Sequence, residues 1–248
     1  MDKSTFGKHR LDAVLVHKNF CSQRASKNFL LKNTVKINGK RETDGKKLLS
    51  AEDEIEVERK NGGAIEKFKI ERDVYIAIDK PKGIVCSKAS DSHRTVFEWL
   101  EEKTGSKIEN LHTVGRLDAE TSGLLILTTD GSFSHFVANP ESGVEKTYIA
   151  TLKLKVTSEE RTTYGKAATS GVVLPAEKKA PEERSGRFKL EWLSESECEI
   201  SVTEGKFHEV RRIFKALGNE VVELRRISIG RLRLAGEQVM EIDAEEIF

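Results

Sequence analysis

Cysteine is scarce in this chain of 248 residues, and the few copies are far apart. The three cysteines, Cys21, Cys86 and Cys198, form no Cys-x-x-Cys pair, and no two histidines lie three or four residues apart. A disulfide framework and a structural zinc site are therefore not expected, and reduced thiols in a cytoplasmic protein are the simpler interpretation. We expect no protein-bound metal.

Long hydrophobic runs are also missing. No apolar stretch approaches the roughly 18 residues that a membrane-spanning helix needs. The N-terminal sequence MDKSTFGKHR carries no apolar segment behind its charges, so we expect no secretory signal. A length of 248 residues nevertheless allows one or two domains with a sizeable core, although only 37% of the residues are hydrophobic. Membrane, fibrous and wholly disordered classes are excluded.

The charges nearly cancel, with 42 Lys and Arg against 41 Asp and Glu, but they are unevenly distributed. Between Lys3 and Lys47 there are twelve basic residues against three acidic ones, and the last thirteen residues hold five acids and no base. A basic segment of this kind favours a polyanionic partner, although a solvated charged surface would give the same count.

The first 58 residues are predicted to form a small basic domain of two helices and a hairpin. Leu11, Val14 and Leu15 have helical spacing, and Asn38-Gly39 between alternating residues is typical of a tight hairpin turn. A second helix is expected after Ser22 as its N-cap, with Ala25, Phe29 and Leu30 on its apolar side.

This segment resembles the helix-helix-hairpin RNA-binding module of a small-subunit ribosomal protein, which many RNA-modifying enzymes share. The matching residues are Arg10-Leu11-Asp12, Ser22 with Arg24, and Val35-Lys36-Ile37-Asn38-Gly39. The resemblance implies an RNA-binding surface, and the basic residues expected to contact RNA are Arg10, Arg24, Lys27, Lys32 and Lys36.

Residues 59–73 are polar and contain Gly62-Gly63, so they are interpreted as a linker with a short ordered edge. Residues 74–248 are predicted to form a second domain in which strands outnumber helices without alternating regularly, which favours an α+β fold with a mixed, mostly antiparallel sheet. The expected strands are Val74–Ile78, Leu124–Thr129, Thr147–Leu154, Phe188–Leu193, Glu199–Val202, Val221–Leu224 and Ile227–Leu234, and the expected helices are Val96–Lys103, Ser132–Asn139, Ser158–Ala168 and His208–Leu217.

The sharpest local signal is the sequence GRLDAETSGLLILTTDG, which begins at Gly115. It places one carboxylate, Asp118, on a glycine-containing loop that leads into a buried strand. A loop braced by a rigid strand suits a nucleophile or an acid-base group, and the neighbouring Arg116 would favour the ionised form. From spacing alone, Asp118 could equally bond loop amides.

That sequence resembles the catalytic loop of pseudouridine synthases, specifically of the RsuA-like subfamily that modifies ribosomal RNA. Three other stretches match the same subfamily in the same order, and together with the N-terminal module the resemblance extends over residues 8–235. They are Lys80-Pro81-Lys82-Gly83 with Val85-Cys86-Ser87, then Glu145-Lys146-Thr147-Tyr148, and finally the segment from Glu204 to Ile213 with Gly218-Asn219 and Val222-Glu223-Leu224.

The third motif is also amphipathic in its own right. Val210, Ile213, Phe214 and Leu217 form an apolar stripe, and His208, Arg211, Arg212 and Lys215 are expected on the opposite, basic side. The family pattern implies that a basic residue here pairs with the catalytic aspartate. Arg211 matches best and Arg212 is the alternative. Glu209 stands where glutamine is commoner and adds a negative charge beside the site.

The resemblance implies that Asp118 is the catalytic carboxylate, kept charged by Arg211 and Arg116, and that Tyr148 stacks on the target base. The reaction breaks the glycosidic bond of a uridine, rotates the base and rejoins it through carbon, which requires no cofactor. The target must leave its stack to reach such a site. The sequence leaves open whether Asp118 attacks the sugar or the base.

We therefore expect a monomeric, cytoplasmic isomerase that converts a uridine of small-subunit ribosomal RNA to pseudouridine. Large-subunit ribosomal RNA is the alternative substrate within this class. A non-catalytic RNA-binding or ribosome-assembly factor is a second hypothesis. A third is a hydrolase with Asp118 as nucleophile, which would need a second carboxylate such as Glu120 or Glu145 across the cleft.

Overall fold

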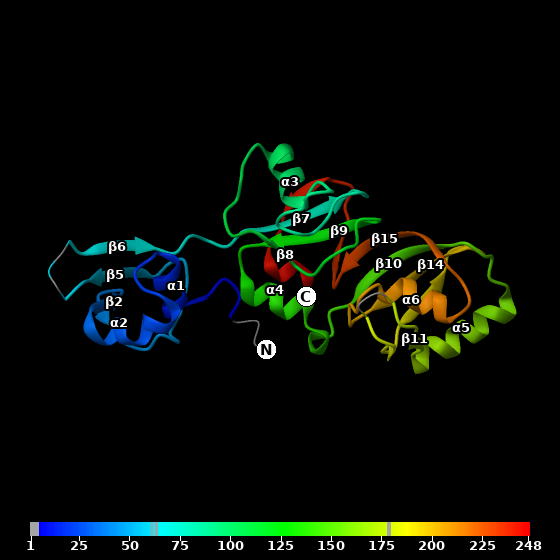
Figure 1. Cartoon of the computed structure of the whole chain (residues 1–248), viewed down its shortest axis with the longest axis horizontal. Coiled ribbons are helices and arrows are strands. Elements are labelled where there is room, and N and C mark those ends of the chain that lie inside the picture. The colour runs from blue at the N-terminus through cyan, green and yellow to red at the C-terminus, as the bar shows by residue number, and fades with distance from the viewer. Residues whose placement is uncertain (1–4, 61, 63, 178–179) are drawn as a thin grey trace. The chain divides into compact units, whose positions relative to one another are not determined.

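The computed structural model describes residues 5–60, 62, 64–177 and 180–248. It divides into two compact units, Met1–Asp73 and Val74–Phe248 (Figure 1). Residues 1–4 of the predicted first domain, and residues 61 and 63 of the predicted linker, lie outside the described residues. Within the described residues, no helix is long and apolar enough to cross a membrane.

The first unit contains the two helices and the hairpin expected from its sequence. Its helices are α1 (Leu11–His17) and α2 (Ser26–Lys32), the latter preceded by a 3₁₀ turn at Gln23–Ala25. A four-stranded sheet has the order β3-β2-β5-β6, with bounds β2 (Thr34–Ile37), β3 (Lys40–Arg41), β5 (Glu54–Glu58) and β6 (Glu66–Lys69), and β1 (His9–Arg10) pairs with β4 (Leu48–Leu49).

The hairpin turn between β2 and β3 has the expected geometry, because Asn38 (φ 50°) and Gly39 (φ 77°) both adopt positive φ. Strand β6 lies inside the segment interpreted as a linker, and it pairs antiparallel with β5. The core of this unit is built from α1, α2 and both central strands, with Leu11, Leu15 and Leu30 almost completely buried.

The start of the second helix differs from the prediction. Ser22 precedes the 3₁₀ turn and its side chain caps no backbone N–H, while the α-helix begins four residues later. As a result Ala25 is exposed and Ser26 is buried, with its hydroxyl donating to the carbonyl of Gln23 at 2.9 Å. The 3₁₀ turn rotates the apolar side by one residue, which helical periodicity alone could not reveal.

The second unit is built on one large, mixed sheet, and this confirms the predicted α+β fold. Its strand order is β13-β14-β10-β15-β9-β7-β17, with β16 added to β15 and β8 to β9. Among the strand pairs of the described residues, β15–β9 is the only parallel one. The bounds are β7 (Tyr75–Lys80), β8 (His112–Thr113), β9 (Thr121–Thr128), β10 (Lys146–Leu152), β13 (Lys189–Trp192), β14 (Glu197–Val202), β15 (Val221–Ile229), β16 (Leu232–Arg233) and β17 (Val239–Glu241), and a separate ribbon pairs β11 (Val173–Leu174) with β12 (Glu183–Arg184).

Helices α3 (Val96–Thr104), α5 (Ser158–Ser170) and α6 (Glu209–Ala216) contribute side chains to one continuous core together with Leu125 and Leu127 of β9 (Figure 1). The alternate residues of this strand are also buried, so the sheet is covered on both faces. Helix α4 (Gly131–Ala138) packs its Phe133 and Phe136 rings against Phe248 near the C-terminus.

Strand β15 is longer than expected. The sequence predicted two strands with a break after Leu224, but one strand runs unbroken to Ile229 and then turns at Gly230. Its parallel pairing with β9 brings Arg226 beside Gly123, and a Cβ at Gly123 would lie 2.1 Å from the Arg226 carbonyl oxygen. Glycine is thus required for the close approach of the two strands that carry the site.

Candidate active site

The largest concentration of predicted site residues lines one cavity of about 370 Å³ in the second unit. Asp118 comes from the loop before β9, Tyr148 from β10 and Arg211 from α6, and all three side chains line it. Arg116 lines it as well and is exposed. Residues that are 30 to 95 positions apart in the sequence are therefore brought to one site.

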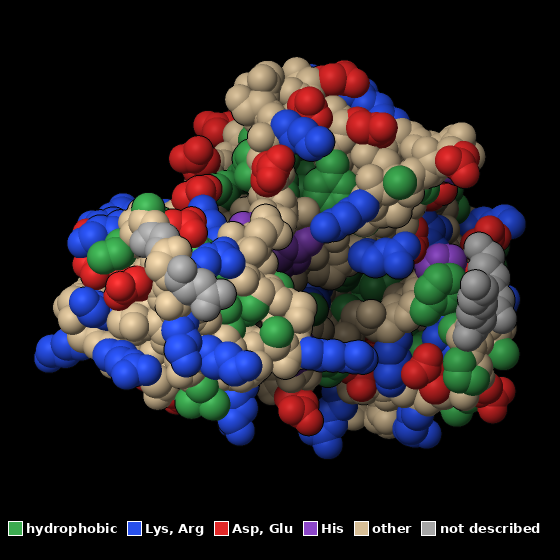
Figure 2. All heavy atoms as spheres, turned by 60° about the vertical axis from the view of Figure 1, so that its left-hand side comes forward, with side chains coloured by type: hydrophobic (Ala, Val, Ile, Leu, Met, Phe, Trp, Pro, Cys, Tyr) green, Lys and Arg blue, Asp and Glu red, His purple; other side chains and the backbone are tan. Residues whose placement is uncertain are grey.

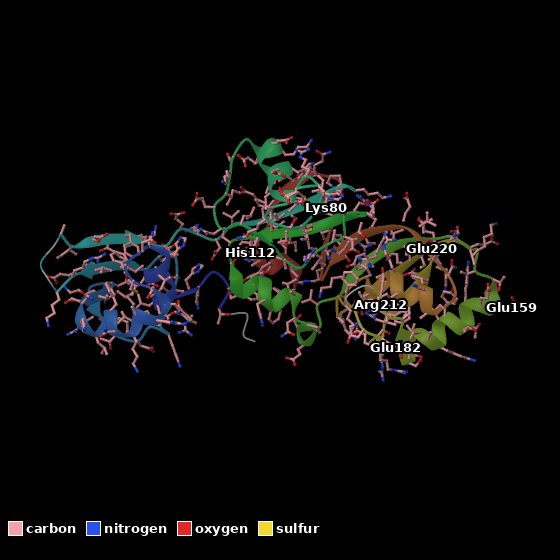
Figure 3. The ribbon with its side chains drawn as sticks, viewed as in Figure 1. Lys80, His112, Glu159, Glu182, Arg212 and Glu220 are labelled. Carbon is pink, nitrogen blue, oxygen red and sulfur yellow. The ribbon has the colours of Figure 1, made fainter. Side chains whose placement is uncertain are left out.

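The loop that carries Asp118 is held from below by a buried lysine. Lys80, at the end of β7, is fully buried, and its ammonium group donates to the carbonyls of Pro81 (2.9 Å) and Ile84 (2.8 Å) (Figure 3 labels this residue). A longer contact of 3.4 Å reaches the carbonyl of Ala119, the residue after Asp118. The Asp118 side chain remains 42% exposed, so its carboxylate is accessible.

The basic side chain beside Asp118 is a histidine. His208 Nε2 lies 3.4 Å from Asp118 Oδ1, and its Nδ1 lies 3.1 Å from Glu177 Oε1. His208 has a left-handed backbone (φ 48°), and its ring stacks on that of Phe207 at 3.9 Å between centroids. Sequence analysis placed His208 on a helix face and missed this contact, because the left-handed turn before α6 gives no clear sequence signal.

The two adjacent arginines of α6 have different surroundings. Arg211 lines the cavity, and its Nη1 donates to the carbonyl of Val221 at 2.9 Å. Arg212 is completely buried, pairs with Glu183 at 2.8 Å and donates to several backbone carbonyls, including that of Pro181 (Figure 3). The expected basic face of this helix therefore excludes Arg212, and of the two arginines only Arg211 faces the cavity.

Tyr148 is 8% exposed and lies across from Arg226 of β15. Arg226 Nη1 approaches the Tyr148 hydroxyl at 3.4 Å, and the guanidinium lies 5.9 Å from the centre of the tyrosine ring. Lys146 is two residues before Tyr148 on the same strand, so both point to the same side and both line the cavity. Sequence analysis missed both cations, although strand alternation from Tyr148 could have indicated Lys146.

Glu209 is a buried residue of the cavity lining. Its Oε2 accepts hydrogen bonds from the backbone N–H groups of Gly205 (2.7 Å) and Lys206 (3.2 Å), which fixes the loop before α6. Burial raises the pKa of Glu209 to about 7, despite these two hydrogen bonds.

The basic residues predicted for the first unit lie mostly on its surface (Figure 2 shows the Lys and Arg side chains there). Arg24, Lys27 and Lys32 are exposed, and none of them has an ion pair in the described part of the chain. Lys36 is half-buried on β2. Arg10 differs, because its guanidinium already binds both carboxylate oxygens of Asp12.

Comparison with known families decides between the hypotheses. A family model described as RNA pseudouridylate synthase matches residues 74–216, which is more than half of the chain. The chain belongs to the RNA pseudouridylate synthase family. A second family model, the S4 domain, matches residues 9–55 of the first unit.

Relatives of this synthase cover almost its whole length. A protein of Pasteurella multocida named ribosomal small subunit pseudouridine synthase A is 33% identical over 96% of this chain and 97% of its own. A protein of Haemophilus influenzae with the same name is 35% identical over 89% and 88%. A crystal structure of a pseudouridylate synthase superposes with a TM-score of 0.62 at 33% identity, covering 96% of this chain and 97% of the other.

The synthase fold also bears on the hydrolase hypothesis. Glu120 is exposed and does not line the Asp118 cavity, and Glu145 pairs with Lys189 at 2.5 Å outside it. Two glutamates do line the cavity. Glu204 accepts a hydrogen bond from the backbone N–H of Gly186, and Glu209 accepts one from the backbone N–H of Gly205. Neither predicted partner carboxylate therefore faces Asp118.

Proposed function

We propose that this synthase isomerises one uridine of small-subunit ribosomal RNA to pseudouridine, with Asp118 as the catalytic carboxylate. The observation that carries the proposal is the convergence of Asp118, Tyr148 and Arg211 on one cavity of a pseudouridine synthase fold. The names of the Pasteurella and Haemophilus relatives support the small subunit as the substrate.

Within this cavity, each group has a separate task. The exposed carboxylate of Asp118 supplies the nucleophile, on a loop that Lys80 keeps in position. Tyr148 offers an aromatic face on which a flipped pyrimidine can stack while its glycosidic bond is broken. Arg211 and Arg116 line the accessible side of the cavity and are placed to meet phosphates of the target strand.

In this proposal, RNA contacts of the S4 domain offset the free energy that is needed to flip the target base out of its stack. We propose that Arg24, Lys27, Lys32 and Lys36 bind phosphates of a neighbouring RNA segment, since none of them pairs with a carboxylate among the described residues. Arg10 would have to exchange Asp12 for a phosphate and is the weakest of the five candidates. A protein with this substrate would act in the cytoplasm, where ribosomal subunits assemble.

The test compares ribosomal RNA from cells with and without this gene, mapped by carbodiimide labelling and primer extension. Loss of one stop in small-subunit RNA, restored by the gene and not by its Asp118→Asn variant, is the expected result. A stop lost from large-subunit RNA would reassign the substrate. No lost stop in either RNA, or full restoration by Asp118→Asn, would contradict the proposal.

A further inference from the structure

Arg226 is a buried cation with an unused hydrogen-bond donor at the cavity. It is 3% exposed, and its Nε donates to the Leu124 carbonyl at 2.7 Å while Nη1 approaches the Tyr148 hydroxyl. Its Nη2 is buried and has no hydrogen-bond partner among the described residues. Buried donors are rarely left unpaired, so this nitrogen indicates a group that is absent from the protein itself.

A second buried cation lies on the neighbouring strand. Lys146 is 7% exposed, lines the same cavity and donates to the Thr203 carbonyl at 3.1 Å. Burial, together with the charge of Arg226, lowers the pKa of Lys146 to about 8, and Glu209 partly opposes them. The electrostatic influence of Arg226 on Lys146 places the two positive charges in one neighbourhood.

Neither cation has a carboxylate partner among the ion pairs of the described residues. Of the acidic side chains that line the cavity, Asp118 lies beside His208, Glu204 binds Lys206, and Glu209 accepts from backbone N–H groups. A second orphaned atom, Thr121 Oγ1, belongs to another residue of the cavity lining. Buried charge without a partner is costly in a folded protein, so a bound anion would stabilise this arrangement.

The proposed reaction creates such an anion. When the bond from C1′ of the ribose to N1 breaks, its electron pair stays on the pyrimidine, and the negative charge spreads over N1 and the two carbonyl oxygens. C5 then bonds to C1′, any bond that Asp118 had made to the sugar or the ring breaks, the C5 proton is released to a base, and N1 takes up a proton, so charge and atoms balance. The charge develops on the base whether Asp118 first bonds to the sugar or to the ring.

We propose that Arg226, assisted by Lys146, stabilises the detached pyrimidine anion and is a catalytic residue of this synthase. This inference rests on the proposed function. Arg226 lies against Tyr148, the aromatic side chain assigned to the base, whereas the more accessible Arg116 and Arg211 are available to phosphates. A preorganised cation in a water-poor site stabilises developing charge far more than an exposed one does.

The test uses the full-length protein in excess over an RNA that the wild type modifies, with either uridine or 5-fluorouridine at the target position. The rate measured is the first-order loss of the original N-glycosidic nucleoside, followed by digestion and mass spectrometry. Fluorine withdraws electrons and makes the pyrimidine anion intrinsically more stable. A group that stabilises the anion therefore matters less for the fluorinated base.

We expect Arg226→Gln to slow the uridine reaction by roughly 10²- to 10³-fold, with RNA affinity within about threefold of wild type. The loss should be at least tenfold smaller with 5-fluorouridine, and Arg226→Lys should recover part of it. Arg225→Gln is the matched control, because Arg225 is the preceding residue on β15 but pairs with Asp79 at 2.7 Å and does not line the cavity. It should change both rates by less than about threefold.

Equal losses on the two bases would overturn the inference and leave Arg226 with a structural role. A loss confined to RNA affinity and corrected by saturating RNA would also overturn it, in favour of a phosphate contact. If thermal melting shows that Arg226→Gln is not folded, the rates on uridine and 5-fluorouridine are compared for Lys146→Gln and Arg226→Lys instead. A wild-type protein that modifies no uridine would sink the proposed function itself, which is a separate outcome.

Discussion

The two units of this synthase use positive charge in opposite ways. In the first unit, Arg24, Lys27 and Lys32 are exposed and unpaired within the described residues, while in the second unit Lys80, Arg212 and Arg226 are almost completely buried. Exposed charges attract the RNA backbone without needing one exact geometry, and salt weakens this attraction. One such lysine or arginine can therefore replace another, which suits binding of RNA by its shape and charge. Each buried charge is bonded to particular atoms. Lys80 binds carbonyls of the loop after β7, and Arg212 binds Glu183 and backbone carbonyls of the β11–β12 ribbon region. Arg226 binds the Leu124 carbonyl and is the residue proposed to act on the reacting base.

Asp118→Asn should give the largest effect. It tests whether the rate of the reaction can be lost while the affinity for RNA is kept. We expect a loss of about 10⁴-fold or more in single-turnover rate, because the amide cannot act as the nucleophile, with RNA affinity within a few-fold. Rate and filter binding on the same RNA measure the two. Glu120→Gln, an exposed carboxylate outside the cavity, is the control. A variant that keeps even a few per cent of the activity would remove Asp118 from its assigned role.

The neighbouring arginines of α6 give the next largest effect. Arg212→Met should lower the free energy of unfolding by about 3 kcal/mol, because Glu183 and several backbone carbonyls lose a buried donor. Arg211→Met should cost about 1 kcal/mol or less, since it loses one hydrogen bond, but it should slow modification. Urea unfolding separates them. Equal destabilisation would mean that burial does not distinguish the two side chains.

Removing the exposed charges should have a smaller effect, confined to binding. The triple variant Arg24→Gln, Lys27→Gln and Lys32→Gln should weaken RNA binding by roughly tenfold to a hundredfold at low salt. It should also reduce the slope of log affinity against log salt by about 2, at roughly 0.7 per phosphate. Lys166→Gln, an exposed lysine of α5, is the control. An unchanged slope would show that the S4 domain does not bind phosphates through these residues.

The sequence predicted the elements and motifs of this molecule better than their contacts. Alternating and helical patterns identified both units and the hairpin at Asn38-Gly39, because these depend on local backbone preferences and on which side chains are apolar. The resemblance to the family motifs then predicted that Asp118 and Tyr148 lie in one site, and both line the same cavity. The family pattern favoured Arg211, but helical spacing could not distinguish it from Arg212, since a helix turns about 100° per residue and both positions flank the apolar stripe.

What could not be predicted depends on tertiary partners. The contact of His208 with Asp118 requires a left-handed residue before α6, and the burial of Arg226 requires a parallel pairing of β15 with β9 that Gly123 makes possible. Lysine and arginine in strands are ordinarily surface residues, so no sequence pattern indicated that Lys80 and Arg226 would be buried.

The substitution of Glu209 has the smallest expected effect. It tests whether this buried carboxyl group lowers the stability of the fold only when it is ionised. Its pKa is raised from 4.5 to about 7 in the folded chain, so between these values the folded state holds more protons than the unfolded state. Stability must then fall as the pH rises from about 4.5 to 7, and the loss persists above 7. Glutamine keeps an oxygen that can accept the N–H groups of Gly205 and Lys206, and it carries no charge.

We therefore expect Glu209→Gln to raise the free energy of unfolding by about 1–2 kcal/mol at pH 8 and to make little difference near pH 4.5. Urea unfolding of both proteins at pH 4.5, 6 and 8 measures the change. Glu52→Gln, a carboxylate exposed on the first unit, should shift neither curve appreciably. A stabilisation that is the same at every pH would show that packing, and not the buried charge, sets the cost at this position.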